Sequence, residues 1–395
     1  MRARQRRGTD DALMTALLVT ENFPPRIGGS SRWLWELYRR MPSSEVAVAA
    51  GSWPGAAAFD RTHGLRIDRL PLSFRDLGLL SPRSAAAYAR AALTVRSLAR
   101  RRIARVVHCG RVLPEGWLAL ACRRPFACYA HGEDMLSYGT SRQLTWMARC
   151  VVRHAAALIA NSHHTAMLLQ RDWDVDPQRI TILAPGVDTS RFSPAPHDQA
   201  VRRALGWAER FVVLTVGRLQ RRKGHDYMID AVDRLRRDFP DVLYAIVGDG
   251  DDRAALEERV RRAGLTAHVR FHGAVDDDQL IRCYQQCDLF ALPNRTVGVD
   301  LEGFGIVLLE AQACGRAVLA GDSGGTAEAM QDGRTGVIAD CNRPESLAVA
   351  VAALMRAPER RAELGAAGRR WVTDTFDFDR NARHAAETIA GALPS

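Results

Sequence analysis

The stretch FVVLTVGRLQRRKG, residues 211–224, decides the fold of this chain. Five of its first six residues are apolar and four of the six are β-branched, so they predict a buried β-strand, which Gly217 ends with a turn. Lys223 and Gly224 close this turn, and a helix is predicted to begin near His225. A strand, a glycine turn and a helix in this order predict one unit of a parallel sheet that is covered by helices.

The same alternation continues on both sides of this stretch. In the first half of the chain the predicted strands cover residues 12–20, 45–50, 106–108, 126–130, 158–160 and 180–183. In the second half they cover residues 211–216, 243–247, 269–271, 289–291, 317–320 and 336–338. We therefore expect an α/β protein with two Rossmann-like domains, whose parallel sheets face each other across a cleft. A ligand is expected in the cleft, at the carboxyl ends of the strands.

Prolines and glycines predict the domain boundaries of the 395-residue chain. Prolines and a glycine between residues 185 and 196 predict a linker, so one domain is expected over 14–187 and a second over 188–376. Residues 1–13 are basic and polar and are expected to form a disordered tail. An amphipathic pattern predicts a last helix over residues 376–393.

Lys223 is the only lysine among the 55 lysine and arginine residues of the chain. The lysine ammonium is a compact point charge, whereas arginine presents a wide planar fork. A narrow slot beside phosphate oxygens accepts the first and rejects the second. Chance survival of one lysine in an arginine-biased sequence is the alternative explanation.

Three glycine turns follow predicted strands and precede predicted helices, at residues 28–29, 217–224 and 303–305. The free N–H groups at a helix N-terminus can hold a phosphate. None of the turns matches the GxxxxGK[ST] motif of P-loop kinases and ATPases or the GxGxxG motif of dinucleotide dehydrogenases, so both classes are disfavoured. Together with Arg218 and Lys223, the three turns predict a cleft that binds a diphosphate.

The segment EGFGIVLLE places two glutamates eight residues apart, at Glu302 and Glu310. Carboxylates accept hydrogen bonds from neighbouring hydroxyl groups, such as those of a ribose or a hexose. Two solvated glutamates would be the simpler explanation. However, Glu310 lies in an otherwise apolar helix, where a buried carboxylate needs partners.

These motifs together resemble the retaining GT-B glycosyltransferases of family 4. The resemblance rests on Gly28 and Gly29, on the Gly-Arg-x4-Lys-Gly segment at 217–224 and on the Glu-x7-Glu segment at 302–310, and it covers nearly the whole chain. The segments NFPPRIGG at 22–29, RTVGVDLEG at 295–303, GIV at 305–307 and EAQACG at 310–315 are similar to those of the bacterial phosphatidylinositol mannosyltransferases of the PimB-like group.

The resemblance implies roles for residues of both domains. The N-terminal domain is expected to hold the acceptor, with residues 377–395 packing back on it, and the C-terminal domain to hold the nucleotide sugar. The resemblance implies that Arg218 and Lys223 bind the donor diphosphate, and that the backbone of Phe304, Gly305, Ile306 and Val307 binds the distal phosphate and the sugar. The turn at Gly28 and Gly29 is expected to close over the donor from the other domain. Glu302 is expected to bind the sugar hydroxyls and Glu310 the ribose, with the base near Gly248 and Gly273. His131 is expected near the anomeric carbon, with Asp134 close by. Arg221 or Arg222 is expected to share the phosphate role.

The function implied is a retaining transfer of a hexose, with mannose favoured, from a nucleotide sugar to a lipid-linked, glycan or other acceptor in cell-envelope polysaccharide or glycolipid synthesis. GDP-mannose is the favoured donor and a UDP-hexose the second choice, with neither a cofactor nor a metal. The acidic clusters at 249–252 and 276–278 begin or flank helices instead of forming a metal-binding DxD motif beside a glycine turn. The phosphate leaving group is expected to assist on the same face as the incoming acceptor.

Several alternatives stay open at this point. They are a glycosyltransferase that uses a UDP-sugar and a soluble acceptor, a nucleotide-sugar 2-epimerase of GT-B fold, and an arginine-rich protein that binds membranes or nucleic acid without catalysis. A glycosyl phosphorylase is disfavoured, because its pyridoxal phosphate would need the lysine already placed at the diphosphate. A nucleic-acid binder would leave Lys223, Glu302 and Glu310 unexplained.

The positive charge lies in the first half of the chain, which predicts an anionic partner surface. Residues 1–200 contain 28 arginines against 16 acidic residues, whereas residues 201–395 contain 27 basic and 29 acidic residues. An arginine-rich solvated surface is the alternative. The helix predicted over 31–41 places most of its apolar residues in the core and leaves Arg32, Trp35, Arg39 and Arg40 toward the rim, and a second basic helix adds the arginines of residues 90–105.

Eight cysteines without metal-ligand spacing favour a reducing compartment. We therefore expect a cytoplasmic enzyme at the inner face of the plasma membrane, with a nucleotide sugar and a membrane-presented acceptor as partners and no nucleic acid.

Overall fold

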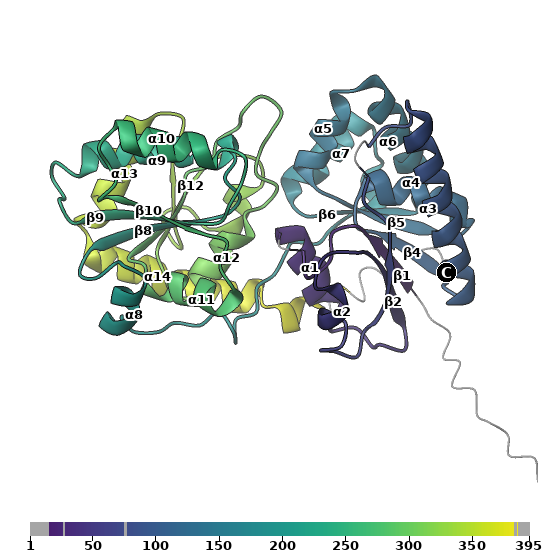
Figure 1. The fold of residues 1–395 in the computed structure, drawn as a ribbon, viewed down its shortest axis with the longest axis horizontal. Helices are drawn as coiled ribbons and strands as arrows, with labels where there is room; N and C mark the ends of the chain where they lie inside the picture. The colour runs from purple at the N-terminus through teal and green to yellow at the C-terminus, as the bar shows by residue number, and fades with distance from the viewer. Residues whose placement is uncertain (1–15, 27, 75–76, 383–384, 386–395) are drawn as a thin grey trace, which may run out of the picture.

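The structure is a computed structural model that describes residues 16–26, 28–74, 77–382 and 385. It contains two α/β domains side by side, each with a central sheet between layers of helices (Figure 1). The two sheets confirm the expected architecture. The proposed basic tail, residues 1–13, lies outside the described residues.

The sheet of the N-terminal domain has seven strands in the order β3-β2-β1-β4-β5-β6-β7, and each neighbouring pair is parallel. The strands are β1 Ala16–Thr20, β2 Val46–Gly51, β3 Arg66–Leu70, β4 Val106–Cys109, β5 Phe126–Ala130, β6 Ala157–Ala160 and β7 Ile180–Ile182. The strand order reverses between β1 and β4, and such a switch point is where open α/β sheets usually bind ligands, at the carboxyl ends of the strands.

The C-terminal domain repeats this plan with six parallel strands in the order β10-β9-β8-β11-β12-β13. The strands are β8 Phe211–Val216, β9 Val242–Val247, β10 Val269–Gly273, β11 Leu289–Leu292, β12 Val318–Gly321 and β13 Val337–Ala339. The order reverses between β8 and β11, so the turn that follows β8 lies at a second switch point.

Helices cover both faces of each sheet. The helices of the N-terminal domain are α1 Gly29–Tyr38, α2 Ala56–Phe59, α3 Pro82–Arg101, α4 Trp117–Ala119, α5 Gly132–Gly139, α6 Arg142–His154 and α7 His163–Trp173. Those of the C-terminal domain are α8 Gln199–Ala204, α9 His225–Leu235, α10 Arg253–Arg262, α11 Asp277–Gln286, α12 Ile306–Ala313, α13 Pro344–Met355 and α14 Pro358–Thr375. Within the described residues, none of these helices has the length and apolarity needed to cross a bilayer.

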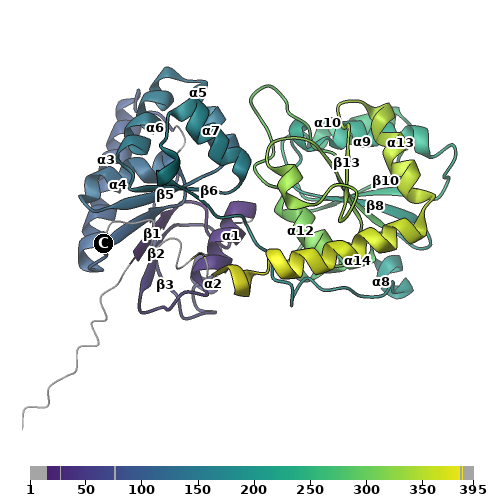
Figure 2. The same ribbon diagram turned by 180° about the vertical axis from the view of Figure 1, so that it is seen from behind.

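The chain passes between the domains twice, and the two passages are hydrogen-bonded to each other. The N–H of Val187 donates to the carbonyl of Phe376 at 2.9 Å, and the N–H of Phe378 donates to the carbonyl of Val187 at 3.0 Å. After α14 ends, the chain is helical again at residues 378–382 and 385 (Figure 2). Phe378, Ala382 and Ala385 join the core of the N-terminal domain, which confirms the expected return of the C-terminus.

Two local expectations differ from the structure. Strand β3 was not predicted, because its sequence Arg-Ile-Asp-Arg-Leu is charged and none of its residues is fully buried at the sheet edge. The helix predicted over 376–393 starts later, because residues 376 and 377 form a bend and a bridge to the linker. Residues 383–384 and 386–393 of that prediction lie outside the described residues.

Candidate active site

Three helices that begin at the cleft lack a side-chain cap. Helices α1, α9 and α12 start after Gly28, Gly224 and Gly305, and among the residues that the structure describes no side chain caps their first N–H groups. In contrast, a serine side chain caps each of α3, α6 and α7. The three glycine turns predicted from the sequence therefore leave backbone N–H groups available for an anion.

The turns of the two domains approach each other closely. A Cβ atom added to Gly29 would lie 3.4 Å from Cδ1 of Ile306, which starts α12 in the other domain. A Cβ atom added to Gly303 would lie 3.1 Å from Nδ2 of Asn161, at the end of β6. The Gly28-Gly29 turn therefore faces the Gly303–Gly305 turn across the cleft.

Lys223 and Glu302 form a buried ion pair at the centre of this arrangement. The ammonium of Lys223 donates to Oε2 of Glu302 at 2.5 Å, and Arg222 donates to the same oxygen at 2.7 Å. Both cations come from a short 3-10 turn that precedes α9. Burial raises the pKa of Glu302, but Lys223 and Arg222 outweigh it and hold the pKa below its ordinary value. Glu302 is therefore an ionised acceptor in a nearly dry site.

Arg222 also connects the two domains. Its guanidinium donates to Glu133 of α5 in the N-terminal domain at 2.8 Å, and its Nε lies 3.0 Å from Asp300. Of the two arginines expected to share the phosphate role, Arg222 is buried beside Lys223, whereas Arg221 is exposed. The geometry therefore favours Arg222. Arg218 is also exposed, at the Gly217 turn, and its phosphate role stays a prediction.

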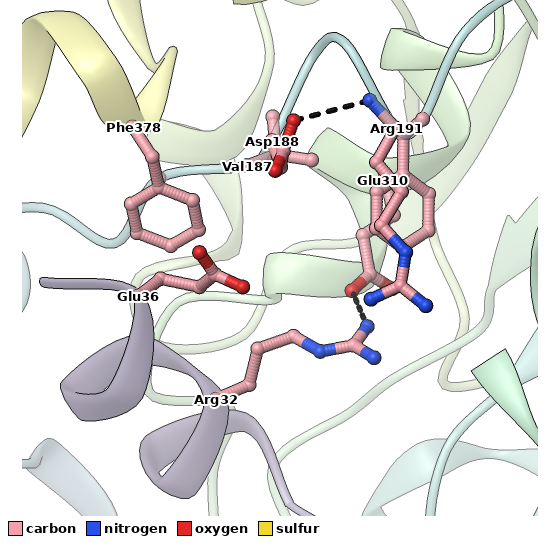
Figure 3. Close-up of a pocket in the computed structure, with 9 residues that line it drawn as sticks. Arg32, Glu36, Val187, Asp188, Arg191, Glu310 and Phe378 are labelled. Carbon is pink, nitrogen blue, oxygen red and sulfur yellow. Dashed lines mark hydrogen bonds and ion pairs between the residues drawn. The ribbon is translucent and has the colours of Figure 1, made fainter. Parts of the chain in front are cut away.

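Glu310 is buried and both of its carboxylate oxygens have partners. Tyr284 donates to Oε2 at 2.6 Å, and Arg32 of α1 reaches across the cleft to donate to Oε1 at 2.9 Å (Figure 3). Arg32 also pairs with Asp277. The buried carboxylate thus has the partners that its apolar helix required, although its role at a ribose stays a prediction.

Two glycines explain how the backbone of the C-terminal domain closes around this site. Gly224 has φ 75°, and a Cβ atom there would lie 1.8 Å from the carbonyl oxygen of Pro293. Gly248 has φ 129°, and a Cβ atom there would lie 2.0 Å from the carbonyl oxygen of Gly217. Only glycine fits either position. Gly273 accepts a hydrogen bond from Gly248 at 2.8 Å, so the two residues predicted near the base are adjacent.

Phe304 has its side chain in the core of the C-terminal domain, where its ring packs against Phe376 at a centroid distance of 5.8 Å. Its side chain is therefore not available for a ligand, and the backbone contact to the donor that the resemblance implies stays a prediction. Ile306 and Val307 are half-buried at the first turn of α12, beside Gly305.

His131 and Asp134 bracket the start of α5 on the other side of the cleft. His131 is buried, its Nε2 lies 3.3 Å from the carbonyl oxygen of Gly110, and burial lowers its pKa despite the nearby Glu133. A buried, neutral imidazole fits a polar contact near a sugar better than a charge. For Asp134, burial raises the pKa to about 7, although Arg111 opposes the shift.

We expect Asp134→Asn to remove a pH dependence of stability. Because the pKa of the folded state, about 7, lies above the ordinary 3.8, protonated Asp134 stabilises the fold below pH 4, and this contribution is lost as the pH rises through 7. The side chain is partly exposed, so we expect a loss of about 1–2 kcal/mol. Urea unfolding between pH 4.5 and 8 measures it. The exposed Asp251→Asn should behave as wild type, and equal slopes in all three proteins would contradict the assignment.

The four residues of α1 and its C-terminal end that were expected at a lipid-facing rim are partly or fully exposed, and each makes contacts within the protein. Arg32 spans the cleft, as described. Arg39 pairs with Glu36, and Arg40 pairs with Glu36 and with Asp379 at the domain connection. Trp35 is half-buried and packs against Phe23, Phe59 and His63. The arginines of this helix face are thus paired with carboxylates of the protein, which reduces the positive charge that they offer to a lipid surface, and their membrane role stays a prediction.

Sequence reasoning missed several residues of the site. Glu133 lies between His131 and Asp134, both of which were predicted to be in the site. Its position in the first turn of the same helix was therefore a usable signal that it belongs to the site as well. Tyr284 and Asn161 gave no local signal, since each reaches the cleft only through the fold. Glu328 was also missed: its carboxylate accepts the N–H groups of His163 and His164 at 2.7 and 2.8 Å and so caps α7 from the other domain.

Two family profiles match the chain, one in each domain. Residues 27–191 match the family described as Glycosyltransferase Family 4, and residues 198–371 match the one described as Glycosyl transferases group 1. The chain is 34% identical to a GDP-mannose-dependent alpha-(1-6)-phosphatidylinositol monomannoside mannosyltransferase of Mycolicibacterium smegmatis, over 95% of this chain and 98% of that protein. It is 32% identical to a GDP-mannose-dependent monoacylated alpha-(1-6)-phosphatidylinositol monomannoside mannosyltransferase of Corynebacterium glutamicum, over 92% and 94%.

A solved structure shares the arrangement of both domains. The Anabaena protein HepE, in complex with UDP and glucose, superposes with a TM-score of 0.80 over 95% of this chain and all of that one, at 21% identity. This likeness shows the GT-B fold. Because the profiles cover both domains and the first relative covers nearly the whole chain, the protein belongs to the family 4, or group 1, glycosyltransferases of GT-B fold.

Proposed function

We propose that this glycosyltransferase transfers mannose from GDP-mannose to a phosphatidylinositol-type lipid acceptor. The observation that carries the proposal is the buried group of Lys223, Arg222 and Glu302 at a glycine turn that faces Gly28-Gly29 across the cleft. Cations beside free helix N–H groups suit a diphosphate, and an ionised carboxylate between them suits sugar hydroxyls. Relatives named for GDP-mannose and phosphatidylinositol mannosides cover nearly the whole chain, which supports this donor and acceptor.

We propose that the transfer retains the configuration of the anomeric carbon. The bond from the anomeric carbon to the β-phosphate oxygen breaks, and a bond to the acceptor oxygen forms on the same face. The acceptor proton passes to the departing phosphate oxygen, so the products are GDP and the mannoside. Lys223 and Arg218, with the N–H groups at the start of α12, stabilise the negative charge that develops on the diphosphate. NMR of the product tests this stereochemistry, because the coupling constants at the anomeric position report the configuration of that carbon.

We propose that the acceptor binds on the N-terminal side of the cleft. His131 follows the end of β5 and Asp134 lies in the first turn of α5, beside Glu133, which contacts Arg222 of the C-terminal domain. We propose that the enzyme works in the cytoplasm, on acceptors presented at the inner face of the plasma membrane.

We expect turnover to continue after treatment with EDTA. The acidic residues that a metal would need are used in other ways: Asp276 caps α11, and Asp277 pairs with Arg32 and Arg191. Positive charge for the leaving group comes instead from Arg218 and Lys223. The measurement compares the initial rates of EDTA-treated enzyme with and without added Mg²⁺ or Mn²⁺; abolition by EDTA and recovery with either metal would contradict the proposal.

The experiment that tests the function offers radiolabelled GDP-mannose and UDP-glucose, in parallel, with three acceptors. These are a phosphatidylinositol monomannoside in detergent, inositol phosphate and buffer alone. Label from GDP-mannose should appear in the lipid fraction. Label in inositol phosphate alone would support the soluble-acceptor alternative, and hydrolysis without any acceptor would overturn the proposal. Conversion to a free sugar epimer would support the epimerase instead.

A further inference from the structure

The outer face of α6 carries an unusual stripe of side chains. Arg142, Trp146, Arg149 and Arg153 follow one another at intervals of four, three and four residues, so they lie on one face of the helix. All four are exposed. The opposite face packs on the domain through the buried residues Met147, Ala148, Val151 and Val152. The stripe is therefore held outward by a well-buried helix.

The positive charge of this stripe is not neutralised by the described part of the protein. In residues 16–26, 28–74, 77–382 and 385, no carboxylate lies within ion-pairing distance of Arg142, Arg149 or Arg153. Helix α6 contains no acidic residue, and neither does α3. Arg32 of α1 and the arginines that follow this helix, Arg39 and Arg40, are in contrast paired with carboxylates. The excess charge of the first half of the chain is thus available for a partner at α6.

Apolar side chains stand out of the same surface. Trp146 is 56% exposed, and its ring is supported by Trp117 of α4 at a centroid distance of 5.4 Å. Leu93 of α3 and Leu80, just before α3, are 65% and 87% exposed. Helix α4 contacts both α3 and α6, so the three helices form one layer (Figures 1 and 2). Exposed aromatic and aliphatic groups among arginines suit a lipid interface, where the rings enter the headgroup region and the guanidinium groups meet anionic headgroups.

We infer that the α6 stripe, with Leu80 and Leu93 beside it, docks the enzyme on an anionic lipid bilayer. The inference rests on the proposed function for its biological purpose and adds to it the surface that does the docking. Helix α6 follows α5 after Thr140 and Ser141, and α5 carries Glu133, which contacts Arg222 in the cleft. A bilayer bound at α6 therefore lies next to the acceptor side of the cleft, so an acceptor headgroup can enter while its acyl chains stay in the membrane.

Co-sedimentation with vesicles tests this surface directly. Vesicles of phosphatidylcholine with 30% phosphatidylinositol are compared with pure phosphatidylcholine, at low and at high salt. The full-length wild type should bind the anionic vesicles at low salt and lose most of this binding at high salt. The triple variant Arg142→Glu, Arg149→Glu, Arg153→Glu should bind at least tenfold more weakly. Trp146→Ala should weaken binding severalfold while leaving the charge unchanged.

The control is a triple charge reversal on the other domain, Arg237→Glu, Arg334→Glu, Arg370→Glu. These arginines are equally exposed, so the control has the same net charge and should bind vesicles like wild type. Thermal unfolding midpoints within a few degrees of wild type verify that each variant folds, and the single variant Arg149→Glu replaces the triple variant if it does not. Equal binding by the α6 variants and wild type would overturn the inference, as would equal weakening in the control.

Failure of the proposed function gives a different result. Mannose transfer by the wild type to an acceptor dispersed in detergent measures the proposed function without any bilayer. Co-sedimentation with vesicles measures docking without any sugar donor. Anionic-vesicle binding that depends on Arg142, Arg149 and Arg153 supports the inference even where no mannose is transferred. Transfer in detergent by an enzyme that binds no anionic vesicle overturns it.

Discussion

Lys223→Ala is expected to lower kcat/KM for sugar transfer about 10- to 150-fold. The substitution removes a charge-assisted contact to the leaving diphosphate, and such contacts contribute about 1.5–3 kcal/mol. It also leaves Glu302 with Arg222 as its remaining buried cation. Initial rates over a range of GDP-mannose concentrations, with the acceptor saturating, measure the effect. Arg218→Ala should lower kcat/KM more than tenfold for the same reason.

Lys223→Arg distinguishes shape from charge at this position. The side chain of Lys223 is buried between Gly217 and Glu302, with Cε 3.7 Å from the place of a Cβ on Gly217. A guanidinium is wider than an ammonium, so we expect this variant to be impaired as well. The exposed neighbour Arg221→Ala is the control and should keep wild-type rates. Near-full activity of Lys223→Arg would mean that the single lysine survives by chance.

Glu302→Ala is expected to reduce both stability and activity. The substitution leaves Lys223 and Arg222 without their shared buried carboxylate, and breaking a buried pair of this kind costs about 3–5 kcal/mol. Activity should fall more than tenfold, because the sugar hydroxyls lose a charged acceptor. Glu302→Gln keeps the shape and one acceptor oxygen, so it should be less destabilising.

Urea unfolding and kcat/KM measure the two effects of Glu302→Ala separately. Glu257→Ala serves as the control, since its carboxylate pairs with Arg253 while 43% exposed, and such surface pairs contribute about 0–1 kcal/mol. A Glu302→Ala protein as stable as this control would show that the buried pair does not support the fold. Unchanged kcat/KM would remove Glu302 from the sugar site.

The backbone of the fold was predictable because its signals are local. The strand at 211–216 has the predicted bounds, and so does that at 126–130, since uninterrupted apolar runs in a parallel sheet are buried on both faces. The glycine turns were predictable for a similar reason. At Gly224 and Gly248 the positive φ and a nearby backbone carbonyl leave no room for a side chain, so the sequence must contain glycine there.

The partners of the site residues were not predictable in this way. Arg32 and Glu310 are separated by 278 residues, and nothing in either local pattern indicates that they meet. The periodicity of α1 correctly predicted its buried face, but it gave no sign that Arg32 and Arg40 pair with Glu310 and Asp379, because carboxylates from distant segments do not appear in a helical repeat. Helix α6 was also not singled out, although its buried residues Met147, Ala148, Val151 and Val152 recur at helical spacing and were a usable local signal.

The C-terminal return of the chain constrains the order in which a newly made molecule can mature. The core of the N-terminal domain includes Phe378, Ala382 and Ala385, which leave the ribosome after all strands of the C-terminal domain. Domains generally fold in the order of their synthesis, yet this first domain is incomplete until the last segment arrives. The described strands of the second domain are all made by residue 339 and its last helix by residue 375, so a nascent chain can complete its C-terminal domain while the N-terminal domain still waits for its closing residues.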